Sequence, residues 1–412
     1  MKPINDIDLL SGLPQSSQTG QSTVVDYYSF LIIKDFLYKL CSKQYKSKML
    51  NVERLFGINN MANPSLIPLI PQYQYDDIYS FKQQYTYAFV TYKENEYIIE
   101  LFMNVDIVAD DRQFYIVNVE GIGKNSPDSY ELFNEIHTSA LQASPLKNKI
   151  ILIIDKDFRR NLLTNIEIKP KTSATLSELF LPEDYYFHLE RFIYEIENYK
   201  KDGQTYRYLF NGEPGNGKSQ AISAIINQTY GKITTVIIQG IDYKFFEIFC
   251  FCEQLSPCLL IIDDLDFIAQ DRKSSNSVNQ LNDLLHALDG IHSKPIFFLA
   301  ATNDKRLVDV AASRPGRFDL ILDFGSLDKS NFLKLIRRET DEQNILELFD
   351  SEIMDMLVEK KVTGAFIVNL IKQIKSIIKL KEVSKKEVLN LFNLAYNGFY
   401  KNNNSNSKSV GF

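Results

Sequence analysis

The spacing of hydrophobic residues changes along this chain and predicts two kinds of folded region. In the first region, residues 24–41 and 128–142 carry apolar residues at helical spacing. Runs rich in aromatic and β-branched residues predict strands at 85–92, 97–102, 113–119 and 149–155. We therefore expect a separate mixed α/β domain over residues 25–170.

The second region has a more regular pattern. From residue 207 to 324, short apolar strands alternate with helices, which is typical of a parallel sheet covered by helices on both faces. From 329 to 396 the periodicity is helical throughout. The pattern predicts a three-layer α/β/α subdomain over 175–327 and a small helical lid over 328–398.

Both ends of the chain are polar. Residues 1–24 include a run of Gln, Ser, Thr and Gly, and residues 399–412 are rich in Asn and Ser. Such compositions bury too little apolar surface to fold. We expect a flexible N-terminal segment and a disordered C-terminal tail.

Composition excludes several classes of protein. The 412 residues are 45% hydrophobic and 24% charged, as in soluble globular proteins of two or three domains. A net charge of −6 argues against a broad nucleic-acid surface. With no secretory signal or apolar run of membrane length, a cytoplasmic protein without a membrane anchor is expected.

The four cysteines are too few and too irregularly spaced for a disulfide framework. Cys250, Cys252 and Cys258 lie in an aromatic-rich segment that leads into an apolar strand. Core packing is favoured over a zinc site there, because no C-x-x-C pair or histidine accompanies them.

A phosphate-binding motif dominates the candidate chemistry. A strand-like run at 208–211 precedes it, and a helix beginning at Gln220 follows it. Its glycines let backbone N–H groups face phosphate, Lys218 would reach the β- and γ-phosphates, and the Ser219 hydroxyl would bind Mg²⁺. The motif predicts binding of ATP or GTP through Gly212, Glu213, Pro214, Gly215, Asn216, Gly217, Lys218, Ser219 and Gln220.

Two further apolar strands end in polar side chains. The first leads into Asp263, which is placed to hold Mg²⁺, and Asp264, which is placed to orient or deprotonate the attacking water. The second ends at Asn303, whose amide can hydrogen-bond the γ-phosphate or the water. Because carboxyl ends of parallel strands share one sheet edge, these groups predict one catalytic site.

Two arginines follow, Arg314 and Arg317, beside a proline and a glycine. Arginine can stabilise the charge of a transferring phosphoryl group, including from a neighbouring subunit. A salt bridge within the chain is the alternative for either residue.

Together these motifs resemble the AAA family of ATPases, in the group that contains katanin, spastin and the proteasomal ATPases. The likeness covers residues 205–375. It rests on the phosphate loop, the acidic strand, a helix at 279–290, the second region of homology at 302–319, and the Thr-Gly-Ala-Phe turn at 363–366.

The resemblance implies a function for several residues. Asn303 would be the first sensor, and Arg314 and Arg317 would be fingers that reach the ATP of the neighbouring subunit. Gly364 and Ala365 would contact adenine from the lid. The family works as a ring, most often a hexamer, so we expect a homo-hexamer that uses ATP and Mg²⁺ to remodel or translocate a protein client.

The chain departs from the family at three places. Asp264 stands where the family usually has Glu, and this shorter side chain predicts slower hydrolysis. Glu213 replaces a common proline. The segment 241–246 lacks the aromatic–hydrophobic–Gly pore loop; Tyr243 and Phe245 could line a pore or pack in a helix core. A short loop here also resembles mitochondrial relatives that translocate folded proteins.

Four functions remain in order of preference. The first is a remodelling ATPase whose N-terminal domain recruits the client. The second is an assembly protein that is switched by ATP and hydrolyses it slowly. A nucleic-acid machine is less favoured, because no lid arginine sensor or long basic run is evident. A small-molecule kinase is least favoured, since it would not need the Arg314 and Arg317 pair.

Overall fold

The computed structural model divides the chain into two compact units. One comprises Met1–Lys149 and Lys156–Ile166, and the other comprises Ile150–Asp155 and Glu167–Phe412. The structure describes residues 21–25, 27–58, 66–68, 85–106, 112–122, 128–154, 166–202, 204–239, 245–266, 277–290, 294–304, 316–381 and 383–398.

The first unit contains a six-stranded antiparallel sheet with the order β1-β6-β5-β4-β2-β3. Helices α2 (Tyr27–Cys41) and α3 (Ser129–Gln142) pack against each other and against this sheet. Alternate residues of β4, such as Ala88 and Val90, are buried, as expected where one face of a sheet is covered. The strands are β1 (Gln21–Val25), β2 (Leu50–Ile58), β3 (Leu66–Pro68), β4 (Tyr85–Tyr92), β5 (Asn95–Asp106) and β6 (Arg112–Gly121).

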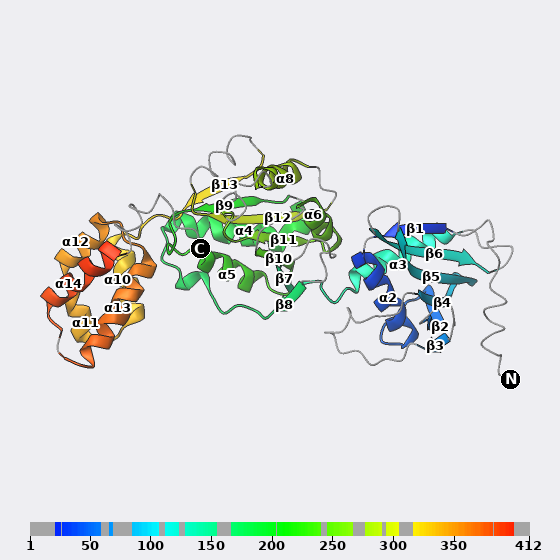
Figure 1. Cartoon of the computed structure of the whole chain (residues 1–412), viewed down its shortest axis with the longest axis horizontal. Helices are drawn as coiled ribbons and strands as arrows, with labels where there is room; N and C mark the ends of the chain where they lie inside the picture. The colour runs from blue at the N-terminus through cyan, green and yellow to red at the C-terminus, as the bar shows by residue number, and fades with distance from the viewer. Residues whose placement is uncertain are drawn as a thin grey trace. The chain divides into compact units, whose positions relative to one another are not determined.

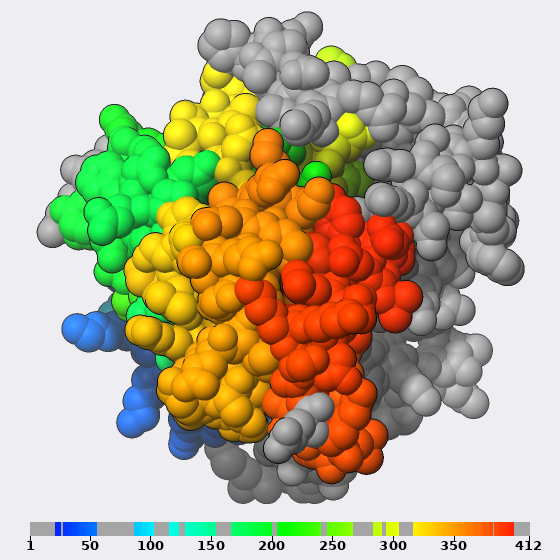
Figure 2. All heavy atoms as spheres, turned by 90° about the vertical axis from the view of Figure 1, so that its left-hand side faces the viewer, coloured from blue at the N-terminus to red at the C-terminus, as the bar shows by residue number. Residues whose placement is uncertain are grey.

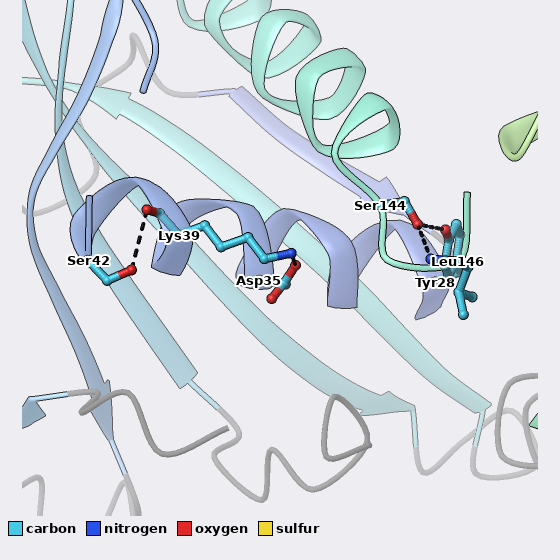
Figure 3. A network of polar contacts seen from close by, with 6 residues as sticks. All are labelled: Tyr28, Asp35, Lys39, Ser42, Ser144 and Leu146. Carbon is cyan, nitrogen blue, oxygen red and sulfur yellow. Dashed lines mark hydrogen bonds and ion pairs between the residues drawn. The ribbon is translucent and has the colours of Figure 1, made fainter. Parts of the chain in front are cut away.

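Polar contacts hold α2 at both of its ends (Figure 3). Near its start, the Tyr28 hydroxyl hydrogen-bonds the Ser144 Oγ, which also accepts from the Leu146 amide at 3.2 Å. Along the helix, Lys39 pairs with Asp35 one turn earlier. The contact between Tyr28 and Ser144 ties α2 to the segment that follows α3.

The second unit is built on a seven-stranded sheet with the order β13-β9-β12-β11-β10-β7-β8. The pairs from β13 to β7 are all parallel. Every residue of β11 and β12 is buried, which explains why these strands have uninterrupted apolar sequences. The strands are β7 (Ile150–Ile154), β8 (Ile166–Lys169), β9 (Arg207–Asn211), β10 (Thr234–Gln239), β11 (Cys258–Ile262), β12 (Ile296–Thr302) and β13 (Leu320–Asp323).

Helices cover both faces of this sheet (Figure 1). Helices α4 (Glu183–Asp202) and α5 (Lys218–Thr229) contact each other on one face, and α6 (Phe245–Gln254) and α8 (Ser277–Asp289) contact each other on the other. Leu189 and Phe192 of α4 join the strand residues in one core cluster. This three-layer parallel architecture confirms the predicted P-loop NTPase fold class.

The position of β7 corrects the predicted domain boundary near residue 170. The run at 149–155 is a strand, as expected, but it pairs with β10 in the second sheet rather than with the antiparallel sheet of the first unit. An apolar strand buried on both faces suits a parallel sheet, and Ile150–Ile153 are all buried.

Among the described residues, five helices form the lid within the second unit. Figure 2 shows their atoms, in yellow to red, on the side that faces the viewer. They share one apolar core, which includes Phe332, Leu357 and Ile371. Side chains of Asp328, Asp350, Thr363 and Ser384 cap four of these helices by accepting backbone N–H groups. The helices are α10 (Lys329–Glu339), α11 (Gln343–Leu348), α12 (Ser351–Glu359), α13 (Gly364–Ile378) and α14 (Lys385–Tyr396).

Two of the three cysteines expected in the core are buried there, whereas Cys250 is partly exposed. Cys252 and Cys258 are fully buried, and burial raises the pKa of the Cys252 thiol well above its usual range. The described part of the chain holds no group of three or more His, Cys, Asp or Glu side chains placed to bind a metal ion together. Within that same part, no helix has both the length and the apolar composition needed to cross a bilayer.

Candidate active site

A cavity of about 660 Å³ lies in the second unit, between the phosphate loop and the lid. Its lining includes Lys218, Asp264 and Asn303 from the α/β part, and Ala365 from the lid. The predicted strand-end residues Asp264 and Asn303 therefore meet the predicted lid turn at one place, whereas Asp263 does not line the cavity. The loop residues from Pro214 to Gln220 also line the cavity, whereas Gly212 and Glu213 do not.

The phosphate loop needs its glycines. Gly212, Gly215 and Gly217 all have positive φ, at 150°, 88° and 91°. A Cβ on Gly212 would lie 2.2 Å from the carbonyl oxygen of Phe324, so only glycine fits there. The buried Asn216 donates from its Nδ2 to the same carbonyl at 2.9 Å, and α5 begins directly after Gly217. This geometry leaves a helix N-terminus open toward the cavity, where an anion is favoured.

Lys218 is buried at the centre of the loop. Its Nζ donates to the carbonyl oxygens of Gly212 and Glu213 and, at 2.8 Å, to the Oδ1 of Asn303. Burial lowers the pKa of this lysine. Its contact with Asn303 joins the phosphate loop to the end of β12.

Oxygen ligands for a divalent cation lie beside the loop. The Ser219 Oγ donates to the Oδ1 of Asp263 at 3.3 Å. Burial, the largest cause, raises the pKa of Asp263, and the nearby charge of Asp264 adds to this. A hydroxyl and a carboxylate are ligands that suit Mg²⁺, and cation binding would hold Asp263 in its charged form.

Asp264 has an unusual backbone conformation. Its φ is +61°, in the left-handed region where Asp and Asn are the most tolerated residues after glycine. The short side chain at this position, where a longer Glu was expected from the resemblance, therefore has a local backbone reason. Asp264 lines the cavity, as its predicted role requires.

Sequence reasoning missed Asp266. This carboxylate is only 7% exposed and accepts hydrogen bonds from the Thr302 Oγ1, the Asn303 amide and Nδ2, and the Asp304 amide. It therefore fixes the end of β12 against the end of β11. The sequence carried one signal for this residue, because Asp266 is the third acidic residue in the short run after β11.

Arg317 does not line the cavity of its own chain. It is 6% exposed and forms a bidentate pair with Asp289, in which its Nε and one terminal nitrogen each lie 3.0 Å from a carboxylate oxygen. This is the salt bridge that the sequence left open as an alternative. Arg314 lies outside the described residues.

The lid contacts the phosphate loop directly. The Ala365 amide donates to the carbonyl oxygen of Gly215 at 3.2 Å, at the capped start of α13. Gly364, also predicted to bind nucleotide, lines the cavity beside it. Lid residues Arg338 and Lys372, which sequence reasoning missed, line the cavity as well, and Arg338 lies 4.8 Å above the ring of Phe180.

The candidate pore segment contains one buried and one exposed phenylalanine side chain. Phe245 is 1% exposed and belongs to the core, whereas its neighbour Phe246 is 75% exposed at the start of α6. Tyr243 lies outside the described residues. Within the described part of this segment, the aromatic exposed for a pore is therefore Phe246 rather than Phe245.

Residues 208–326 match the family described as "ATPase family associated with various cellular activities (AAA)". A proteasome-activating nucleotidase of Methanococcus vannielii is 30% identical over 163 residues, which cover 36% of this chain and 40% of that protein. A putative cell division cycle ATPase of Plasmodium falciparum is 29% identical over 222 residues, which cover 48% of this chain and 18% of that protein.

The rat peroxisomal ATPase PEX6 is 30% identical over 145 residues, 31% of this chain and 15% of that protein. The chain thus spans less than half the length of each of these relatives. The matched segment contains the phosphate loop, the acidic strand, Asn303 and Arg317. Residues 208–326 of this chain are an AAA ATPase domain with the P-loop NTPase α/β fold.

Proposed function

We propose that this chain hydrolyses ATP in the cavity between the phosphate loop and the lid. The observation that carries the proposal is the convergence of Lys218, Asp264 and Asn303 on that one cavity. Loop amides and Lys218 bind the phosphates, and the Asp264 carboxylate accepts a proton from the attacking water. Leu335 and Val368 give the lid side of the cavity an apolar wall for the base.

The residues present fit Mg²⁺ as the cofactor. Ser219 and Asp263 offer adjacent oxygens of the hard type that Mg²⁺ prefers. Once bound, the ion would neutralise charge on the phosphates. Asp263 would orient it, and Asp264 would stay available for the water.

The wider proposal is a ring, most simply a homo-hexamer, that remodels or translocates a protein client. The exposed Phe246, at the start of a helix that follows a central strand, can contact a polypeptide. The separate antiparallel unit supplies a surface for recruitment. The relatives named proteasome-activating nucleotidase and peroxisomal ATPase support a protein rather than a nucleic-acid client. A cytoplasmic location suits this proposal.

Phosphate release, measured as a function of protein concentration, tests both the proposed ATP hydrolysis and the proposed ring. Turnover per chain should rise with concentration if Arg314 or Arg317 of a neighbour completes the site, and it should vanish in Lys218→Ala, which removes the phosphate-binding ammonium. Arg314→Ala is the cleaner finger variant, since Arg317 also forms an internal salt bridge. Turnover that stays constant on dilution and survives Arg314→Ala would refute the shared site.

Asp264 supports a second candidate, an ATP-switched assembly protein with slow hydrolysis. Its side chain is one methylene shorter than that of glutamate. This function would be favoured if the protein assembles only with ATP and releases phosphate more slowly than the assembly comes apart. Turnover that a protein client accelerates would favour the remodelling ATPase.

A further inference from the structure

The side-chain amide of Asn303 has one orientation. Its Oδ1 accepts from the Lys218 Nζ at 2.8 Å, and its Nδ2 donates to the Asp266 Oδ2 at 2.7 Å. An ammonium can only donate and a carboxylate accepts, so exchanging the amide oxygen and nitrogen would break both contacts. The carbonyl end of Asn303 therefore faces the phosphate loop.

Asp266 can hold this orientation because it is itself held. Besides the Asn303 Nδ2, it accepts from the Thr302 Oγ1 and from two consecutive backbone amides, those of Asn303 and Asp304. It is buried behind Asn303 and does not line the cavity. A carboxylate fixed by backbone donors does not readily rotate, so neither does the amide that it binds.

We propose that Asp266 is a positioning residue that makes Asn303 an acceptor for the attacking water. Asn303 then does not act as a donor to the γ-phosphate. This inference rests on the proposed ATP hydrolysis. A γ-phosphate oxygen is an acceptor and would be repelled by the Asn303 carbonyl, whereas a water O–H is a matching donor.

The resulting step is balanced. One water hydrogen bonds to the Asn303 Oδ1, and the other proton passes to the Asp264 carboxylate. The water oxygen forms a bond to the γ-phosphorus, the bond to the bridging oxygen breaks, and its electron pair leaves with ADP. Lys218 occupies the Asn303 Oδ1 in this structure, and moving to the phosphates would release that oxygen for the water.

An exchange of the two side chains tests the orientation in the full-length protein. Asp266→Asn places an NH₂ group among hydrogen-bond donors, and Asn303→Asp places two carboxylates together, so each should slow turnover by about tenfold or more. The double variant restores one donor and one acceptor between the two side chains, with an acceptor still facing the water, while the new NH₂ group still faces the Asn303 backbone N–H. Its turnover should therefore recover in part and exceed that of the slower single variant by about tenfold.

If the double variant is as slow as the slower single variant while its melting temperature matches wild type, the proposal is wrong. Wild-type protein that releases no phosphate would instead contradict the proposed hydrolysis.

A binding measurement decides the inference without turnover. Asn303→Ala should leave the preference for the β,γ-imido analogue of ATP over ADP within about twofold of wild type. A hydrogen bond to a charged group contributes about 1.5–3 kcal/mol, so loss of a γ-phosphate donor would reduce that preference by about tenfold or more. The larger loss would overturn the proposal even if Asp266→Asn does not fold.

Discussion

Replacing Gly215 by alanine should separate the phosphate loop from the lid. A Cβ at this position would lie 2.8 Å from the Cβ of Ala365 and 3.1 Å from the Oγ1 of Thr363. Gly215 also has a φ of +88°. A left-handed conformation costs a non-glycine residue about 1–2 kcal/mol, and overpacking adds about 1–3 kcal/mol. We therefore expect a total cost of about 2–5 kcal/mol.

Two variants separate these contributions. Gly217→Ala has nearly the same φ, +91°, but its Cβ would have no atom within 4 Å, so it should cost only about 1–2 kcal/mol. Ala365→Gly removes the opposing Cβ. Combined with Gly215→Ala, it should recover the overpacking part, about 1–3 kcal/mol, as a coupling energy.

Hydrogen exchange of peptides from α13, measured without nucleotide, reports this contact locally. Gly215→Ala should accelerate exchange at the start of α13, by about tenfold for every 1.4 kcal/mol of lost local stability. Gly217→Ala should have little effect there. Equal effects of the two variants, or no recovery in the double variant, would show that the loop does not hold the lid through this contact.

Three further predictions concern other residues. Asp264→Asn should keep both the left-handed backbone and ATP binding but slow phosphate release by about a hundredfold. Asp264→Ala should also lose about 1 kcal/mol of stability. Loss of ATP binding in Asp264→Asn would contradict the assigned role. Arg317→Ala should cost about 3 kcal/mol in urea unfolding, because it leaves Asp289 without its bidentate partner; an unchanged midpoint would show that the pair is not structural. Burial lowers the pKa of Lys34 from 10.5 to about 8, so between these pH values the unfolded state binds more protons and the free energy of unfolding should rise with pH. Lys34→Met should remove that rise, and an identical slope in the variant would refute the assignment.

Much of the second unit could be predicted because its signals are local. The glycine spacing of the phosphate loop and the apolar runs of β11 and β12 each lie within a few consecutive residues. The expected sheet and helical lid follow from the same kind of pattern. The convergence of Lys218, Asp264 and Asn303 follows from one rule, that parallel strands end at one edge.

What could not be predicted depends on contacts between distant segments. The partner of Arg317 is on α8, and the donors around Asp266 come from the end of β12. Whether Phe245 or Phe246 is buried depends on how α6 rotates against the sheet. The left-handed φ of Asp264 has no signature in residue spacing.

The pairing of β7 with β10 sets a practical limit on where this polypeptide can be shortened. A fragment starting at residue 175 would look complete from its motifs, but it would leave the backbone of β10 without one of its two hydrogen-bonding neighbours. Unpaired strands of this apolar kind recruit other chains, so such a fragment would aggregate. A fragment starting before Ile150 would keep the pairing of β7 with β10 and remain dispersed.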